Sequence, residues 1–178
     1  KYDVVILGNV PANAFTPASI DALATSIERH GPDRSVGKGL LTLGGMHSYG
    51  PGRWAETNVG DLLPVILERN EVQDFGAALC EDRHWLKPMV MKPAQRHYIT
   101  ALRGTIDEND ALWSSLPPLK GANRFDRLHP QAQVLAESEA EIPLLLARTY
   151  GDGRVLSLAG DTTYQWAMHG QVDAHGRF

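Results

Sequence analysis

The pattern of apolar and polar residues predicts a strand–helix–strand unit at the start of the chain. Residues 2–7 (YDVVIL) form a nearly continuous apolar run, typical of a strand buried on both faces. Thr16 offers an N-cap and Pro17 a first-turn proline for a helix that ends at residues 31–32 (GP). Residues 39–43 (GLLTL) then predict a second buried strand. Two strands joined by a helix favour a right-handed parallel crossover.

The end of the chain has an equally regular pattern. Residues 133–137, 144–150 and 154–159 are three strand candidates. Residues 151–153 (GDG) separate the last two, and a short glycine-rich segment between two strands indicates a hairpin.

The middle of the chain predicts less. Residues 62–67 and 72–80 fit either a short helix or a strand, whereas residues 86–91 and 97–102 favour strands by alternation. Residues 116–119 (LPPL) predict an extended connector, because proline disfavours helix in the residue before it. With no repeat or linker, we expect one α/β domain over residues 1–178.

Composition narrows the class of protein. The 178 residues are 43% hydrophobic and 21% charged, as in ordinary globular domains. A net charge of −4 gives no basic footprint for nucleic acid, so we expect no nucleic-acid partner. No run approaches the roughly 20 apolar residues that a membrane span needs, and the pattern of the first residues predicts a strand rather than a signal peptide. Because strand-like residues begin directly after Lys1, we interpret the chain as an excised segment of a longer protein.

The metal- and thiol-based sites that the sequence offers are weak. A single cysteine, Cys80, excludes an internal disulfide and a Cys-based zinc cluster, and its apolar neighbours are typical of a buried, inert thiol. His169, Asp173 and His175 do not have the spacing of a strong zinc pattern and favour a solvated turn. We therefore predict no metal and no cofactor.

Three segments directly follow predicted strands, where ligands bind in open α/β sheets. The Gly44-Gly45 pair lets the backbone turn sharply and leaves amide groups open to a ligand, although a tight strand exit explains it equally well. Trp54 adds a large apolar surface nearby. The candidate crevice residues are Gly8, Asn9, Gly44, Gly45, Met46, His47, Ser48, Trp54, Asp161, Thr162 and Thr163.

Three of these candidates give only a weak catalytic signal. Asp161 could present a carboxylate to the crevice, but a side-chain cap on the following helix is the commoner role of aspartate at such a junction. His47 and Ser48 are adjacent, and adjacent residues on a strand or turn seldom face each other. The sequence alone therefore gives no catalytic pair.

Four runs of the sequence resemble a known family. YDVVILGNVP, GKGLLTLGGMHSYGPGRW, LWSSLPPLKGAN and GDGRVLSLAGDTTYQW are similar to glutamine amidotransferase-like domains of larger, often membrane-anchored bacterial proteins, some of which carry von Willebrand factor A-type domains. The resemblance covers residues 2–166. It implies a flavodoxin-like three-layer sandwich with a mainly parallel sheet, of the class I glutamine amidotransferase type, with a late β-hairpin.

The same resemblance implies a lost active site. Active members carry a cysteine on a strand-to-helix elbow and a histidine and a glutamate after a late strand. Here Gly45 or Met46 occupies the cysteine position, and residues 160–163 (GDTT) stand where His-x-Glu is expected. The Cys-His-Glu triad is absent, so no catalytic residue is assigned. Backbone amides around residues 8–9 and 45–46 are expected to remain as an anion- or carbonyl-binding nest.

The resemblance also places another strand and helix before residues 2–7, and these are absent from this chain. It therefore implies an exposed sheet edge at which another chain could pair.

We expect a non-catalytic binding or interaction module whose partner is a small ligand or another domain of the parent protein. The parent is expected to be a bacterial protein, extracytoplasmic or membrane-associated. One alternative is a hydrolase of different chemistry that uses Asp161, His47 or Ser48. Another is a glutaminase whose nucleophile is Cys80.

Overall fold

The computed structural model of the chain describes residues 2–28, 38–68, 84–85 and 88–168. Within this part, six strands form one sheet in the order β1-β2-β8-β7-β6-β4, and β3 (His84–Trp85) pairs with β5 (Ala122–Asn123) in a second, small sheet. The strands of the main sheet are β1 (Val4–Gly8), β2 (Gly39–Leu43), β4 (Met91–Pro93), β6 (Gln133–Ser138), β7 (Pro143–Tyr150) and β8 (Gly153–Leu158).

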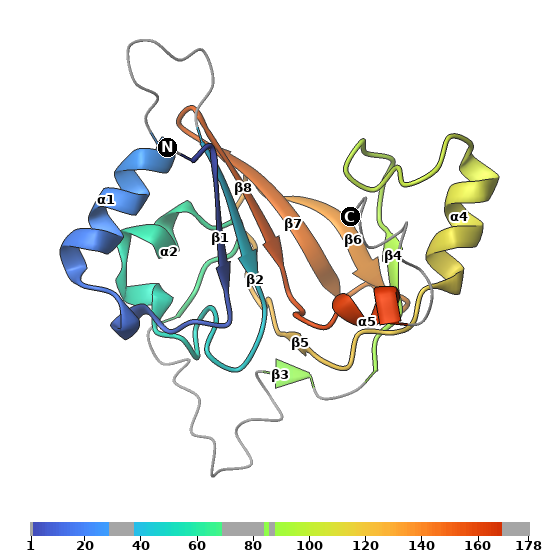
Figure 1. Cartoon of the computed structure of the whole chain (residues 1–178), viewed down its shortest axis with the longest axis horizontal. Helices are drawn as coiled ribbons and strands as arrows, with labels where there is room; N and C mark the ends of the chain where they lie inside the picture. The colour runs from blue at the N-terminus through green and yellow to red at the C-terminus, as the bar shows by residue number, and fades with distance from the viewer. Residues whose placement is uncertain (1, 29–37, 69–83, 86–87, 169–178) are drawn as a thin grey trace.

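Helices lie on both sides of this sheet. Helix α1 (Pro17–Glu28) and helix α2 (Asn58–Leu62) lie on one side, whereas α4 (Ile106–Ser115) and α5 (Tyr164–Met168) lie toward the other (Figure 1). Two 3-10 helices, η1 (Ala12–Ala14) and η2 (Trp54–Glu56), follow β1 and β2. None of the helices in the described ranges is long and apolar enough to cross a membrane.

The sheet is mixed, so the predicted flavodoxin-like sandwich with a mainly parallel sheet is wrong. Only β1, β2 and β8 run parallel to one another. Strands β7, β6 and β4 are each antiparallel to the preceding neighbour in the sheet order. The physical reason is connection length: tight turns join β6 to β7 and β7 to β8, and a tight turn can join only antiparallel strands. The predicted late hairpin is confirmed as β7–β8.

The predicted strand–helix–strand unit is confirmed. Strands β1 and β2 pair in parallel with α1 between them in the chain. Thr16 caps α1, because its hydroxyl oxygen accepts a hydrogen bond from the Ser19 amide at 3.2 Å. The helix buries Ile20, Ala24 and Ile27, which recur at helical spacing.

Burial of β1 differs from the prediction. Val4 and Ile6 are 58% and 61% exposed, whereas Val5 and Leu7 pack against the core. Strand β1 is the terminal strand of the sheet, and the helices beside it cover only one of its faces. A continuous apolar run therefore does not correspond here to burial on both faces.

Predictions for the middle of the chain were partly wrong. Residues 97–102 form turns, with the Thr100 amide bonded to the His97 carbonyl at 3.0 Å. Residues 62–67 are the end of α2 followed by extended chain, where Val65 bridges to Leu128. Residues 72–80 lie outside the described residues.

Between residues 86 and 119, some predicted elements agree with the structure and others do not. Of the predicted strand at 86–91, only residues 88–91 are described, and β4 starts at its end. Helix α4 itself was not predicted, although Thr105 caps the Glu108 amide and Asp107 and Glu108 occupy the first turn. Residues 116–119 are an extended connector as predicted, since Leu116 has φ −71° and ψ 138°.

We predict that Thr16→Ala destabilises the fold by about 1 kcal/mol, because an N-terminal amide of α1 loses its acceptor. Urea denaturation followed by circular dichroism measures this loss. Thr25→Ala, at an exposed site within the same helix, is the matched control and is expected to leave the midpoint unchanged or slightly raised. Equal destabilisation by both variants would contradict the capping role of Thr16.

Candidate functional site

The three segments proposed as crevice residues meet at one end of the molecule. They follow the carboxyl ends of the parallel strands β1, β2 and β8, at the lower end of Figure 1. The Gly44 amide donates to the Gly160 carbonyl at 3.2 Å, which joins the exit of β2 to that of β8. The Ala12 amide donates to the Gly52 carbonyl at 2.8 Å, which joins the loop after β1 to the loop after β2. The three segments that follow these strands therefore lie together.

Close packing explains the glycine pair after β2. A Cβ on Gly44 would lie 1.8 Å from the Ala159 carbonyl oxygen. Gly45 has φ +130°, and a Cβ there would lie 2.5 Å from the side chain of Asn9. Only glycine fits at both positions, because backbone and side-chain atoms of neighbouring segments occupy the space.

Two asparagines hold this turn in place. Asn123 is 1% exposed; its Oδ1 accepts from the Gly45 amide at 2.7 Å and its Nδ2 donates to the Gly45 carbonyl at 3.1 Å. The backbone amide of Asn123 donates to the Ala159 carbonyl at 2.8 Å. Asn123 therefore connects β5 to the exit of β2 and to the exit of β8. Asn9, in the left-handed region at φ 45°, accepts from the His47 amide at 2.8 Å.

These bonds remove the Gly45 amide from the predicted anion-binding nest. The amides of Gly45 and His47 donate to asparagine oxygens, so neither is free to bind an oxyanion in this conformation. Asn123 was missed among the candidate residues. The residues KGAN, within one of the runs that carry the family resemblance, were the only sequence signal for it.

Below the turn lies a buried hydroxyl cluster. Tyr49, in the left-handed region at φ 53°, donates from its hydroxyl to the Leu158 carbonyl at 2.8 Å. The hydroxyl of Thr42 lies 3.1 Å from the Tyr49 oxygen and 2.7 Å from the Ser157 oxygen. Burial raises the pKa of Tyr49, and its hydrogen bonds to Thr42 and Ser157 offset this only in part. Tyr49 is therefore a neutral, structural hydroxyl.

Trp54 has a structural role rather than a ligand-facing one. It is 5% exposed, and its indole nitrogen donates to the Val10 carbonyl at 2.9 Å. Its ring packs against Phe15 with centroids 5.9 Å apart. Trp54 thus fixes the loop after β1 to the loop after β2.

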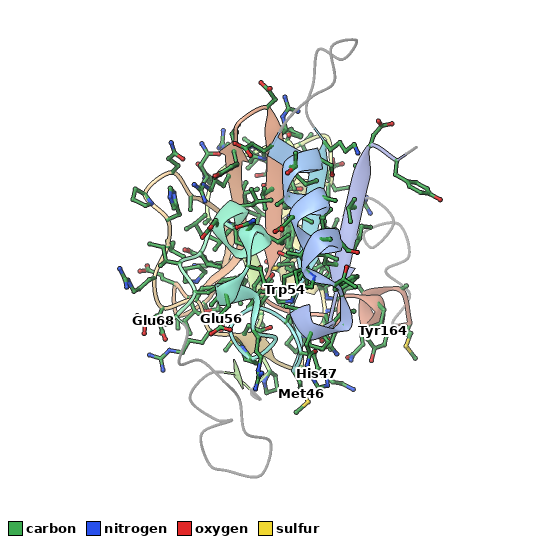
Figure 2. The ribbon with its side chains drawn as sticks, turned by 90° about the vertical axis from the view of Figure 1, so that its left-hand side faces the viewer. Met46, His47, Trp54, Glu56, Glu68 and Tyr164 are labelled. Atoms are coloured by element: carbon green, nitrogen blue, oxygen red, sulfur yellow. The ribbon has the colours of Figure 1, made fainter. Side chains whose placement is uncertain are left out.

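Met46 and His47 form the exposed tip of the turn. Met46 is 41% exposed, His47 is also exposed, and both project from the lower end of the molecule, with Tyr164 toward the same end (Figure 2). Tyr164, 52% exposed, begins α5. Of the two residues expected at the nucleophile position, Gly45 has no side chain and Met46 presents a thioether, which has no proton to lose and no nucleophilic anion.

The residues of the hydrolase alternative lie in different environments. Ser48 is 5% exposed and lines a small internal cavity together with Tyr49 and Trp54. His47 and Asp161 are exposed. A serine nucleophile must reach solvent to meet its substrate, so the buried position of Ser48 weighs against this chemistry.

The loop after β8 also differs from expectation. Asp161 does not cap α5, since no described residue hydrogen-bonds to its carboxylate and the Gln165 amide donates instead to the Thr162 carbonyl at 3.1 Å. The Thr162 hydroxyl oxygen accepts from the Lys120 amide at 3.1 Å. Thr163 is half-buried. Asp161 is thus the exposed carboxylate of this loop.

The remaining candidates fall elsewhere. Cys80, His169, Asp173 and His175 lie outside the described residues. Within the described ranges, no group of three or more His, Cys, Asp or Glu side chains is placed to hold a metal ion.

Comparison with known proteins shows the fold alone. Neither a protein-family model nor a curated protein matches the sequence. Cytoplasmic Protein STM1381 from Salmonella typhimurium LT2 is similar over 96% of this chain and 65% of its own, with 22% identity and a TM-score of 0.68. Cytoplasmic Protein STM3548 from Salmonella typhimurium is similar over 99% and 70%, with 18% identity and a TM-score of 0.70.

A third structure, exo-beta-1,4-mannosidase Op5Man5 from Opitutaceae bacterium strain TAV5, is 16% identical with a TM-score of 0.54. Its match covers 98% of this chain but 24% of the mannosidase. This chain thus spans about two thirds of the two Salmonella proteins and about a quarter of the mannosidase.

We predict that Asn123→Ala destabilises the fold by about 2 to 3 kcal/mol, because the buried amide and carbonyl of Gly45 both lose their partners. Urea denaturation provides the measurement. Asn13→Ala, at an exposed asparagine in η1, is the control and is expected to change stability by less than about 0.5 kcal/mol. A neutral Asn123→Ala variant would show that the turn does not depend on this side chain.

The raised pKa of Tyr49 predicts a loss of stability in alkali. Its folded pKa lies above the unfolded value of about 10, so its stabilising contribution is complete below pH 10 and is lost as the pH rises further. Above pH 10 the loss is about 1.4 kcal/mol per pH unit. Urea denaturation at pH 9 and pH 11 should therefore show a smaller alkaline loss for Tyr49→Phe than for wild type. Tyr98→Phe, at a site 73% exposed, should keep the wild-type dependence.

Proposed function

We propose that this chain is a non-catalytic binding module of a larger protein, and that it is related to the glutamine amidotransferase-like domains that its sequence resembles. The observation that carries the proposal is the internal use of the elbow amides. Asn123 and Asn9 accept from the amides of Gly45 and His47, where an acyl-transfer enzyme keeps donors free for the oxyanion. A turn whose donors are satisfied internally serves as a rigid support rather than as a catalytic elbow.

The residues at the two catalytic positions support the same proposal. Met46 stands at the elbow tip, and Asp161 and Thr162 stand in the loop after β8 in place of a histidine and a glutamate. None of these side chains can act as a thiolate nucleophile with its imidazole base. Covalent hydrolysis of an amide by this route therefore has no nucleophile and no base.

The proposed contact surface is the exposed tip and the loop beside it. Met46 and Tyr164 offer flexible and aromatic apolar contacts, and His47 and Asp161 add a polar rim. An apolar centre with a polar rim is the ordinary composition of a protein contact surface, and methionine adapts well to a partner. We therefore favour another part of the parent protein over a small ligand as the partner.

Similarity to the mannosidase supports a modular role, because the matched fold makes up 24% of that longer chain. At 16% identity, this similarity does not indicate that the chain binds the substrate of the mannosidase. The compartment of the parent protein stays a prediction.

A binding experiment tests the proposal. The 178-residue chain is titrated by calorimetry with the remaining part of its parent polypeptide, produced separately. Met46→Asp is expected to weaken binding at least tenfold, because a carboxylate replaces an apolar contact at the centre of the surface. Ala140→Asp, an exposed site in the turn between β6 and β7, is the matched control and is expected to keep wild-type affinity. Unchanged affinity in Met46→Asp would overturn the proposed surface.

Activity measurements complete this test. Release of ammonia from glutamine, and hydrolysis of a panel of nitrophenyl esters and amides, are expected to stay at the level of buffer. Glutaminase activity that disappears in Cys80→Ala would establish the thiol enzyme instead. Ester or amide hydrolysis that disappears in Asp161→Asn would establish the hydrolase.

A further inference from the structure

One face of the parallel part of the sheet is not covered by the described residues. Val4 and Ile6 of β1 lie in register with Gly39 and Leu41 of β2, and Leu41 lies in register with Leu156 of β8. Side chains on the same face of neighbouring strands form one continuous surface. We call this surface the uncovered face; it consists of Val4, Ile6, Leu41, Ala147 and Leu156.

A groove of about 540 Å³ runs along the uncovered face. Residues 97–99 form its far wall, and its floor is the apolar surface of β1, β2, β8 and β7. Arg154 lies on this face, in register with Gly39 of β2, and no carboxylate is among the residues that line the groove. The groove therefore fits an apolar occupant that carries an acidic group near Arg154.

Parallel strands normally have helices against both faces. Helices α1 and α2 cover the opposite face, where Leu40 and Val155 are each 2% exposed. On the uncovered face, Val4 and Ile6 remain 58% and 61% exposed. A helix is therefore the kind of element that would complete this face.

The handedness of crossovers indicates where in the chain this helix belongs. Strand β1 leads to β2 with α1 on the covered face. Right-handed crossovers place their helices on opposite faces when the chain moves across the sheet in opposite directions. A strand added before β1 at the sheet edge would move in the same direction as β1 to β2, so its helix would join α1. By the same rule, a crossover helix on the uncovered face would follow β8 and return toward β1.

The chain after β8 leaves on that side of the sheet. Trp166 of α5 packs edge-on against Trp113 of α4 with centroids 6.0 Å apart, and its indole nitrogen donates to the Pro117 carbonyl at 2.9 Å. Helix α4 follows the segment whose residues 97–99 form the wall of the groove. Helix α5 therefore lies on the same side of the sheet as the uncovered face.

We propose that an amphipathic helix, supplied by a segment that follows α5 in a longer polypeptide, packs on the uncovered face. Its apolar side contacts Val4, Ile6 and Leu41, and an acidic residue lies near Arg154. The two Salmonella proteins of the same fold have the length for such a segment, since this chain spans 65% and 70% of them. The inference does not rest on the proposed function.

Thiol accessibility tests this proposal. Ile6→Cys is made in a Cys80→Ser background, both in the 178-residue chain and in the full natural polypeptide, and its rate of reaction with a maleimide is measured. The rate is expected to be at least tenfold lower in the full polypeptide, because the helix covers residue 6. Val4→Cys is a second reporter in case Ile6→Cys fails to fold. Ala140→Cys is the exposed control and is expected to react equally in both proteins.

Truncation identifies the occupant. Removal of everything after Phe178 from the full polypeptide should restore the fast rate. Protection that persists after this truncation would assign the face to a segment before β1 and overturn the proposal. Protection that decreases on dilution would assign the covering of this face to a second copy of the chain, and this result would also overturn the proposal. Equal rates in both proteins, or a natural polypeptide that ends at Phe178, would also overturn it.

Discussion

The close approach of four chain segments at the Gly44–Gly45 turn is the constraint on which the site depends. A side chain at Gly44 would meet the carbonyl of Ala159, and one at Gly45 would meet Asn9. Because the backbones lie so close, one buried residue, Asn123, bonds to both strand exits: its side chain bonds to Gly45, and its backbone amide donates to the Ala159 carbonyl. The exposed position of Met46 and His47 follows from this fixed turn.

That turn also sets what chemistry the site can support. Catalytic elbows keep backbone donors free and place a nucleophile above them. Here the donors of Gly45 and His47 are satisfied by asparagines, and a hydroxyl cluster around Tyr49 fills the space beneath. Rigidity of this kind suits a surface that presents Met46 and His47 to a partner in one conformation.

The antiparallel and parallel parts of the mixed sheet differ in how fully their apolar side chains are buried. On the antiparallel side, Leu144, Leu145 and Leu146 of β7 are fully buried. On the parallel side, helices cover one face only, and the apolar side chains of β1 remain exposed on the other. Exposure of such an apolar surface to water costs free energy, and this is the surface on which we propose that a helix packs.

Local signals in the sequence determined the elements that depend on neighbouring residues. Thr16 and Pro17 set the start of α1, residues 151–153 set the β7–β8 hairpin, and the strand-exit glycines marked where the loops gather. Tertiary structure alone decided the direction of the remaining strands, the exposure of Val4 and Ile6, and the use of the Gly45 amide by Asn123, 78 residues away. Periodicity reports which residues favour burial, whereas pairing direction and the partner of a buried amide depend on contacts between segments distant in the chain.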